Sequence, residues 1–203
     1  MSGFSKTFSN GIVKENPLVA LMIGLCSALA VSTSVSNGLV MGLSTTFVLL
    51  MSEITISILK KTIPNSIRCP VFIVVVASFT TVIDYMLRAY LPEASEAIGV
   101  FIMLIAVNCL IMGRVEAFAS KNSVPEVIPD ALGMGFGFTW VLVGISAVRE
   151  LLGNGTLLSI QILPYTFQPI LFFVMPTGGF FVFALFISLN TFLKSKAKPV
   201  KEE

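Results

Sequence analysis

The sequence predicts an all-α integral membrane protein with six transmembrane helices, arranged as two inverted-topology repeats of three helices each. Hydrophobic residues make up 55% of its 203 residues, and charged residues only 12%, roughly half the charged share of soluble domains. The few charges leave long apolar runs between them, and the two halves of the chain resemble each other. These observations exclude a soluble enzyme. The net charge of +2 gives no reason to expect a nucleic-acid partner.

Apolar runs that are long enough to cross a bilayer define the predicted helices. Apart from Cys26, residues 17–52 contain no ionisable side chain, and residues 151–193 contain none apart from Tyr165. A helix needs about 20 apolar residues to cross the hydrocarbon core. We therefore expect six spans in the lipid bilayer, of which the first and fourth are short or interrupted, near 18–35, 38–58, 70–88, 97–113, 130–149 and 170–193.

The distribution of basic residues predicts the orientation. With six spans, both termini lie on one side of the membrane, and that side holds every lysine and arginine except Arg88 and Arg149. The positive-inside rule then places both termini in the cytoplasm. We expect a multi-pass protein of the bacterial cytoplasmic (inner) membrane, with residues 1–203 as a single membrane domain and residues 194–203 as a charged cytoplasmic tail.

An internal repeat predicts the arrangement of the helices. Residues 37–43 open the second span and residues 130–136 open the fifth, and each segment contains a Met-Gly pair followed by a Thr-aromatic-Val-Leu sequence. A short apolar segment with a cysteine precedes each of them. We place repeat one at about 17–90 and repeat two at about 97–193. Because three spans is an odd number, the halves would enter the membrane from opposite sides, an architecture in which interrupted helices meet near the bilayer midplane.

Cys26 and Cys109 occupy matching places in the two repeats. A free cysteine in an apolar helix most often behaves as a small buried hydrophobe. Two thiols related by an inverted pseudo-twofold axis would, however, lie close together, and soft metal centres bind thiolates. An iron–sulfur cluster or a tetrahedral site takes four ligands, and the chain has no histidine. The missing ligands would come from a second subunit. Cys69 has no counterpart in the other half, and we expect it to be structural or incidental.

Four charged residues near the predicted spans are further candidates. Glu53 and Asp84 lie within spans, and intramembrane acids are by default candidates for an ion path, although both lie toward span ends and could reach the interface. Arg114 and Arg149 flank spans, and we expect them to be interfacial anchors.

The chain resembles the RnfE/NqrD family of membrane subunits, most clearly at residues 24–31, 63–68, 107–119 and 149–155. That family supplies a subunit of the Rnf complex, a ferredoxin:NAD oxidoreductase, and of the sodium-pumping NADH:quinone reductase. Arg149-Glu150 followed by Gly-Asn-Gly is closer to RnfE, whereas serine after Cys26 is the NqrD-like form. The balance favours RnfE.

The resemblance implies a function within a translocase and none for the isolated chain. A paralogous subunit of the RnfA/NqrE type would pair with this one, and Cys26 and Cys109 would share an intramembrane [2Fe–2S] cluster with it. The cluster would relay electrons between cofactors on opposite membrane faces, coupled to Na⁺ or H⁺ export. No flavin or NAD is expected on this chain, because it lacks an S-G-A-T attachment sequence and a dinucleotide fingerprint. Other Rnf/Nqr subunits would carry those groups.

Two other functions remain open. A secondary transporter or channel subunit with an intramembrane acidic path would need Glu53 or Asp84 and could dispense with both cysteines. A structural membrane anchor would tolerate changes at all four positions.

Overall fold

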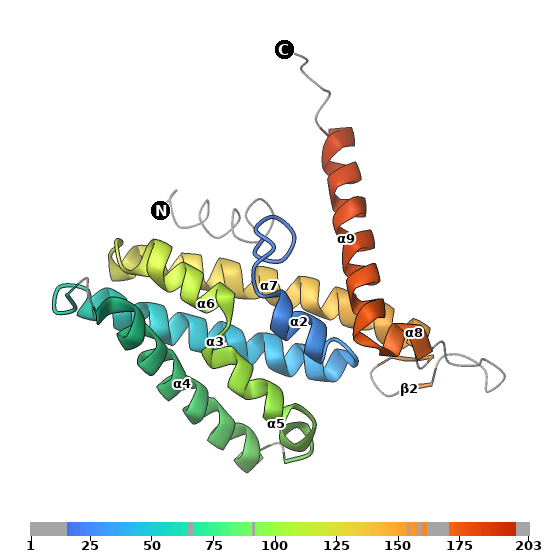
Figure 1. The fold of residues 1–203 in the computed structure, drawn as a ribbon, viewed down its shortest axis with the longest axis horizontal. Coiled ribbons are helices and arrows are strands. Elements are labelled where there is room, and N and C mark those ends of the chain that lie inside the picture. The colour runs from blue at the N-terminus through green and yellow to red at the C-terminus, as the bar shows by residue number, and fades with distance from the viewer. Residues whose placement is uncertain are drawn as a thin grey trace.

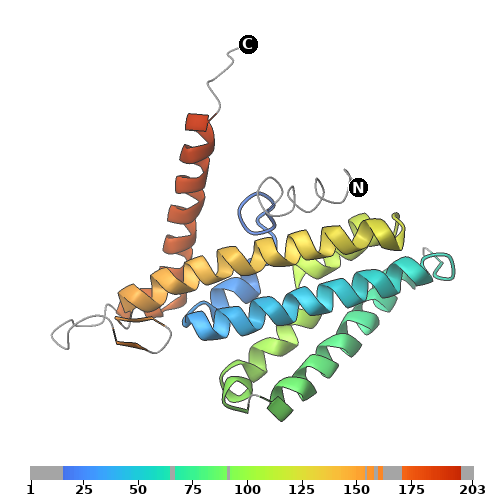
Figure 2. The same ribbon diagram turned by 180° about the vertical axis from the view of Figure 1, so that it is seen from behind.

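Two long antiparallel helices form the centre of the fold. The computed structural model describes residues 16–64, 67–90, 92–153, 155–157, 160–161 and 171–197. Helices α3 (Val35–Leu59) and α7 (Val124–Gly153) lie side by side in both ribbon views (Figures 1 and 2). Both are apolar over most of their length, and their facing sides supply much of the buried core, including Val48, Leu49, Met134 and Phe138.

Two further helices pack beside α3. Helix α4 (Arg68–Tyr90) follows α3 after a short connector and runs back along it, and α5 (Pro92–Ala106) packs against both. Phe72 and Val76 on α4 and Ile102 and Ile105 on α5 are fully buried in the shared core. The opposite sides of these helices expose large apolar side chains such as Val74 and Met103.

The two segments that carry Cys26 and Cys109 form short helices. Residues 16–24 form turns and bends rather than a helix, and α2 (Leu25–Val31) follows them. Helix α5 ends at Ala106, and the chain begins helically again only with α6 (Cys109–Arg114), which continues into the π-helix η3 (Val115–Ala119). The first predicted span is thus a short helix and the fourth is interrupted, as expected from the sequence.

The C-terminal part leaves the central pair. A hairpin of two-residue strands, β1 (Thr156–Leu157) and β2 (Ile160–Gln161), follows α7. Helix α8 (Leu171–Val174) then turns sharply into α9 (Pro176–Ala197), which points away from α3 and α7 in both ribbon views (Figures 1 and 2). The predicted charged tail therefore begins inside α9, and residues 198–203 lie outside the described residues.

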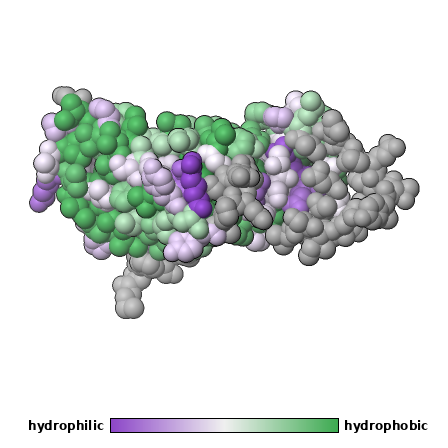
Figure 3. Space-filling view, turned by 90° about the horizontal axis from the view of Figure 1, so that it is seen from below, coloured by the Kyte–Doolittle hydropathy of each residue, from purple (hydrophilic) through white to green (hydrophobic). Residues whose placement is uncertain are grey.

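Four helical segments of the described chain are long and apolar enough to cross a membrane: Val35–Leu59, Arg68–Tyr90, Ile98–Ala119 and Val124–Gly153. The apolar part of α9, Pro176–Phe192, is shorter. On the face seen in Figure 3, hydrophobic residues cover a broad area, with hydrophilic residues scattered among them; exposed apolar patches of this kind are typical of a membrane-facing surface. The prediction of a helical multi-pass membrane protein is confirmed, with the small hairpin as an addition. The six-span inverted repeat stays a prediction, because α2 is far too short to span and α9 does not run alongside the long helices.

Candidate functional site

Both candidate cysteines lie at the beginning of a short helix and are exposed. Cys26 is the second residue of α2, and Cys109 is the first residue of α6. Gly24 precedes α2 with a φ of +89°, in the left-handed region that favours glycine. Asn108 caps α6, because its side-chain oxygen accepts a 2.9 Å hydrogen bond from the Leu110 N–H.

The starts of these two helices touch. The Asn108 amide donates a 2.9 Å hydrogen bond to the hydroxyl oxygen of Ser27, which in turn donates to the Gly24 carbonyl at 3.1 Å. A Cβ added at Gly24 would lie only 3.3 Å from the Asn108 side-chain oxygen. The residue after Cys26 is therefore bonded to the residue before Cys109, so the structure brings together the two segments that the repeat paired.

The two thiols are exposed at the starts of adjacent short helices. Within the described residues, no group of three or more His, Cys, Asp or Glu side chains could hold a metal ion. Cys69 is also exposed, at the second residue of α4, and takes no part in the contacts between α2 and α6.

Glu53 is a fully buried carboxylate on α3. Neither of its oxygens accepts a hydrogen bond from any residue in the described part of the chain. Asp130 and Arg114 are close enough to act on it electrostatically. A charged carboxylate without hydrogen-bond partners is costly in an apolar interior.

Asp84, the other acidic candidate, has a different environment. It forms a 3.0 Å ion pair with Arg88, one turn further along α4, and the Arg88 side chain is 59% exposed. Since α3 and α4 form a hairpin, Asp84 and Glu53 lie roughly 15 Å apart along the helix axes. The structure does not bring the two acids together.

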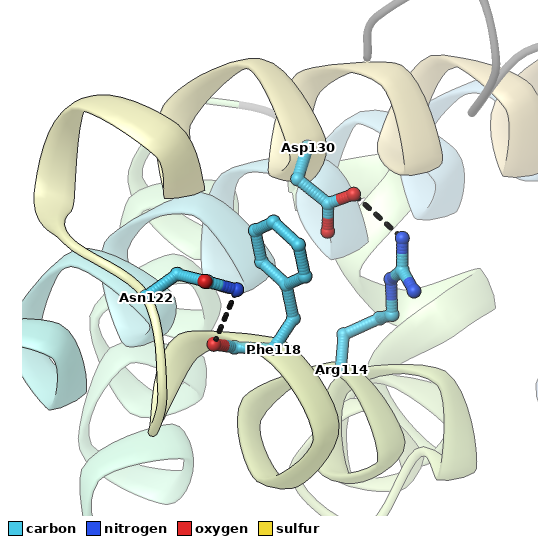
Figure 4. A network of polar contacts seen from close by, with 4 residues as sticks. All are labelled: Arg114, Phe118, Asn122 and Asp130. Atoms are coloured by element: carbon cyan, nitrogen blue, oxygen red, sulfur yellow. Dashed lines mark hydrogen bonds and ion pairs between the residues drawn. The ribbon is translucent and has the colours of Figure 1, made fainter.

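The ion pair between Arg114 and Asp130 was not predicted. Its atoms are 2.6 Å apart, and the two side chains are 16% and 4% exposed. Figure 4 shows the guanidinium turned toward Asp130, with the Phe118 ring beside it at 5.5 Å. The sequence did not predict this partner, because it does not place α7 beside α6. That Arg114 lies at the membrane interface stays a prediction.

Arg149 is buried within the protein. It is 2% exposed, and its guanidinium donates hydrogen bonds to acceptors on α2, on α8 and in the turn after each of these helices. The adjacent Glu150 is equally buried and accepts a 2.7 Å hydrogen bond from the N–H of Val35 at the start of α3. One signal in the sequence could have indicated that Arg149 and Glu150 are buried. The two charges end an apolar helix on the predicted non-cytoplasmic side, which otherwise has almost no basic residues.

The repeated segments meet at the centre of the α3–α7 pair. A Cβ added at Gly42 would lie 2.7 Å from the Thr139 hydroxyl, and one at Gly135 would lie 2.7 Å from the Thr46 hydroxyl. The two hydroxyl oxygens are 3.4 Å apart. Each half thus supplies one glycine and one threonine to a reciprocal contact.

Comparisons with known proteins place the whole chain in one family. A family model described as "Rnf-Nqr subunit, membrane protein" matches residues 4–187. The chain is 43% identical over 194 residues to the E-type subunit of the Na(+)-translocating ferredoxin:NAD(+) oxidoreductase complex of Acetobacterium woodii, and the match covers 96% of this chain and 99% of the relative. It is similar to the E-type subunits of ion-translocating oxidoreductase complexes from Pseudoalteromonas atlantica (41% over 209 residues; 97% and 90%) and Methanosarcina acetivorans (42% over 193 residues; 93% and 91%).

Proposed function

The chain belongs to the Rnf-Nqr family of membrane subunits, and we propose that it is the RnfE-type subunit of an ion-translocating oxidoreductase complex. In this proposal Cys26 and Cys109 supply half of the ligands of an intramembrane [2Fe–2S] centre. The observation that carries it is the hydrogen bond between Ser27 and Asn108, which joins the segments of the two exposed cysteines.

A paralogous subunit of the RnfA/NqrE type would supply the other two cysteines. An iron–sulfur centre at this place supplies a one-electron carrier inside the bilayer. The residues of this chain would hold the two thiolates on adjacent helix starts and keep their spacing fixed. Exposure of Cys26 and Cys109 leaves both sulfurs open to a partner. NAD, ferredoxin and flavin chemistry would belong to other subunits, and the isolated chain would catalyse nothing.

We also propose the finer topology that the sequence predicts. The chain would cross the bacterial inner membrane six times, with both termini in the cytoplasm, as inverted repeats at about 17–90 and 97–193. The reciprocal contacts of Gly42 with Thr139 and of Gly135 with Thr46 support it, because pseudo-twofold symmetry requires such a pair of matching contacts. In the assembled complex α9 would pack across the bilayer against this chain or its partners.

Glu53 favours a role of this chain in export of Na⁺ or H⁺. Its buried carboxylate lacks a hydrogen-bond partner among the described residues, and buried acids in membrane proteins mark ion or proton paths. Asp84, ion-paired near the end of α4, would be the exit or entry of such a path. The alternative function, a transporter or channel subunit with no redox centre, would depend on these two acids alone.

The decisive experiment compares cysteine variants of the whole complex. We would purify it anaerobically from native membranes with Cys26→Ser, Cys109→Ser or Cys69→Ser, and measure iron content, the EPR spectrum of the reduced state and electron transfer. Cys69→Ser is the matched control, since this thiol is also exposed at the start of a helix. We expect loss of the same iron signal in the first two variants only. Survival of iron, spectrum and turnover in both would overturn the proposal.

A further inference from the structure

We infer that Arg149 and Glu150 are positioning residues for Cys26. Together they fix the connector between α2 and α3, and α2 carries Cys26 at its other end. The role of Cys26 rests on the proposed function, whereas the hold on the connector does not depend on it.

Arg149 binds the C-terminal end of α2. Its Nη1 atom donates to the Leu29 carbonyl at 3.0 Å and to the Ser32 hydroxyl at 2.5 Å. The last carbonyl groups of a helix lack helical partners, and a cation there also interacts favourably with the helix dipole. The same guanidinium donates to the carbonyls of Phe173 at 3.1 Å and Met175 at 3.2 Å. Arg149 thereby ties α2 to the α8–α9 turn as well as to α7.

Glu150 holds the other side of the connector. Its Oε2 atom accepts a 2.7 Å hydrogen bond from the Val35 N–H, the first residue of α3. Ser34, in the N-cap position of α3, makes no side-chain capping bond. The carboxylate of Glu150 takes over that capping function from a distant part of the chain. A charge-assisted bond of this kind is roughly twice as strong as a neutral one.

Because α2 is short, contacts at its C-terminal end also restrict the position of the Cys26 thiol. The helix has only seven residues, and Cys26 is one turn from Leu29. At its start, Ser27 is bonded to Asn108. Because α2 has so few residues and is bonded to other segments at both ends, we expect it to move as one unit. A shift of its C-terminal end would then also move Cys26.

In the other half of the molecule, residues at the end of α3 bind the connector that precedes α7, but with other residue types. The Ser57 hydroxyl on α3 donates a 2.9 Å hydrogen bond to the Asn122 carbonyl in the connector before α7, and Lys60 donates to the same carbonyl at 2.6 Å. Ser57 and Glu150 are separated in sequence by the same 93 residues as Thr46 and Thr139. Each long helix therefore holds the connector in front of the other long helix. On the Cys26 side the connector is held by two buried residues of opposite charge, Arg149 and Glu150.

The test uses Arg149→Lys, Glu150→Gln and Ser32→Ala in the purified complex. Lysine keeps the charge, but its ammonium cannot reach acceptors on several segments at once, whereas Arg149 does so with a planar five-donor fork. Ser32→Ala removes one acceptor and leaves both charges, so it provides a measurement should a charge variant fail to assemble. The matched controls are Arg88→Lys, on an exposed arginine, and Glu126→Gln, on an exposed carboxylate that accepts from the Ser123 N–H.

We expect normal iron content in these variants, a changed EPR line shape and a shifted midpoint potential of the centre, and electron transfer reduced roughly tenfold. Hydrogen–deuterium exchange of residues 25–35 should become faster, and the two controls should match the wild type. The exchange measurement separates the two proposals, because it does not depend on iron. Faster exchange together with a Cys26→Ser complex that keeps its iron would overturn the role of Cys26 but leave the hold on the connector intact. Unchanged exchange, spectrum and potential in all three variants would overturn the inference.

Discussion

The side-chain amide of Asn108 and the hydroxyl of Ser27 form a 2.9 Å hydrogen bond between two fully buried residues. Ser27 follows Cys26 directly, and Asn108 directly precedes Cys109. The bond therefore fixes the relative position of two cysteine-bearing segments that are more than 80 residues apart in the sequence. A preorganised pair of ligands lowers the cost of completing a site with a partner.

Removal of this bond should destabilise the chain by different amounts from its two ends. Ser27→Ala removes the bond between the helices and the weaker bond of Ser27 to the Gly24 carbonyl, and should lower the free energy of unfolding by about 1 kcal/mol. Asn108→Ala also removes the cap of α6 and should cost about 1 kcal/mol more. Thermal unfolding of the purified protein in detergent would measure both. Equal losses for the two variants would show that the cap contributes nothing.

Gly42→Ala should disrupt the contact between the central helices. The added methyl group would overlap Thr139, and overpacking of this kind costs about 1–3 kcal/mol. The double variant Gly42→Ala with Thr139→Ala should recover most of that loss, because the second change makes room for the first. Gly99→Ala is the matched control, since a Cβ there would meet nothing within 4 Å. A Gly42→Ala protein as stable as the control would contradict the close approach.

Asp130→Asn should destabilise the protein by about 3 kcal/mol, because it removes the carboxylate that pairs with the poorly exposed Arg114. Asp84→Asn also breaks an ion pair, but the Arg88 side chain is mostly exposed, and we expect a loss below about 1 kcal/mol. Chemical or thermal unfolding of both variants gives the comparison. Similar losses would mean that burial of the Arg114–Asp130 pair does not set its contribution.

Glu53→Gln should separate electron transfer from ion transport. The change keeps the size of the side chain and removes its charge, so we expect iron content and assembly to be retained. Ion uptake into vesicles that contain the complex should fall to the level of passive leak. Glu116→Gln is the control, because this glutamate is exposed beside Arg114 rather than buried. Transport that stays coupled in the Glu53 variant would remove Glu53 from the path.

Hydropathy in the sequence predicted the long helices α3, α4 and α7, because each is a run of apolar residues of bilayer length. The fourth span was expected to be short or interrupted, but the position of its break, directly before Cys109, was not predicted. The direction of α9 could not be predicted. An apolar run specifies only that a helix forms and avoids water, and the direction of α9 depends on the close α8–α9 turn at Gly178.

The sequence indicates candidate ligands but not the residues that surround them. Cys26 and Cys109 can be singled out because thiol chemistry is visible in a sequence, and their role as ligands stays a prediction. The sequence does not predict the contacts of Arg149, because its partners are the backbone carbonyls of residues 29, 173 and 175 and the Ser32 hydroxyl. Every residue has a backbone carbonyl, so the sequence does not indicate which carbonyls an arginine will contact. Asp130 was overlooked for the related reason that its partner lies on another helix.

The reciprocal glycine–threonine contact also closes the space between α3 and α7. At that level the two central helices leave no space for a methyl group between them, and both threonine hydroxyls are engaged with carbonyls of their own helices. Close packing of α3 against α7 at Thr46 leaves little room for water between the two helices at this level. In the proposed function, an ion path from Glu53 would therefore have to leave the α3–α7 contact before Thr46, two turns away on α3, and continue toward α4 and α5 or toward a partner subunit.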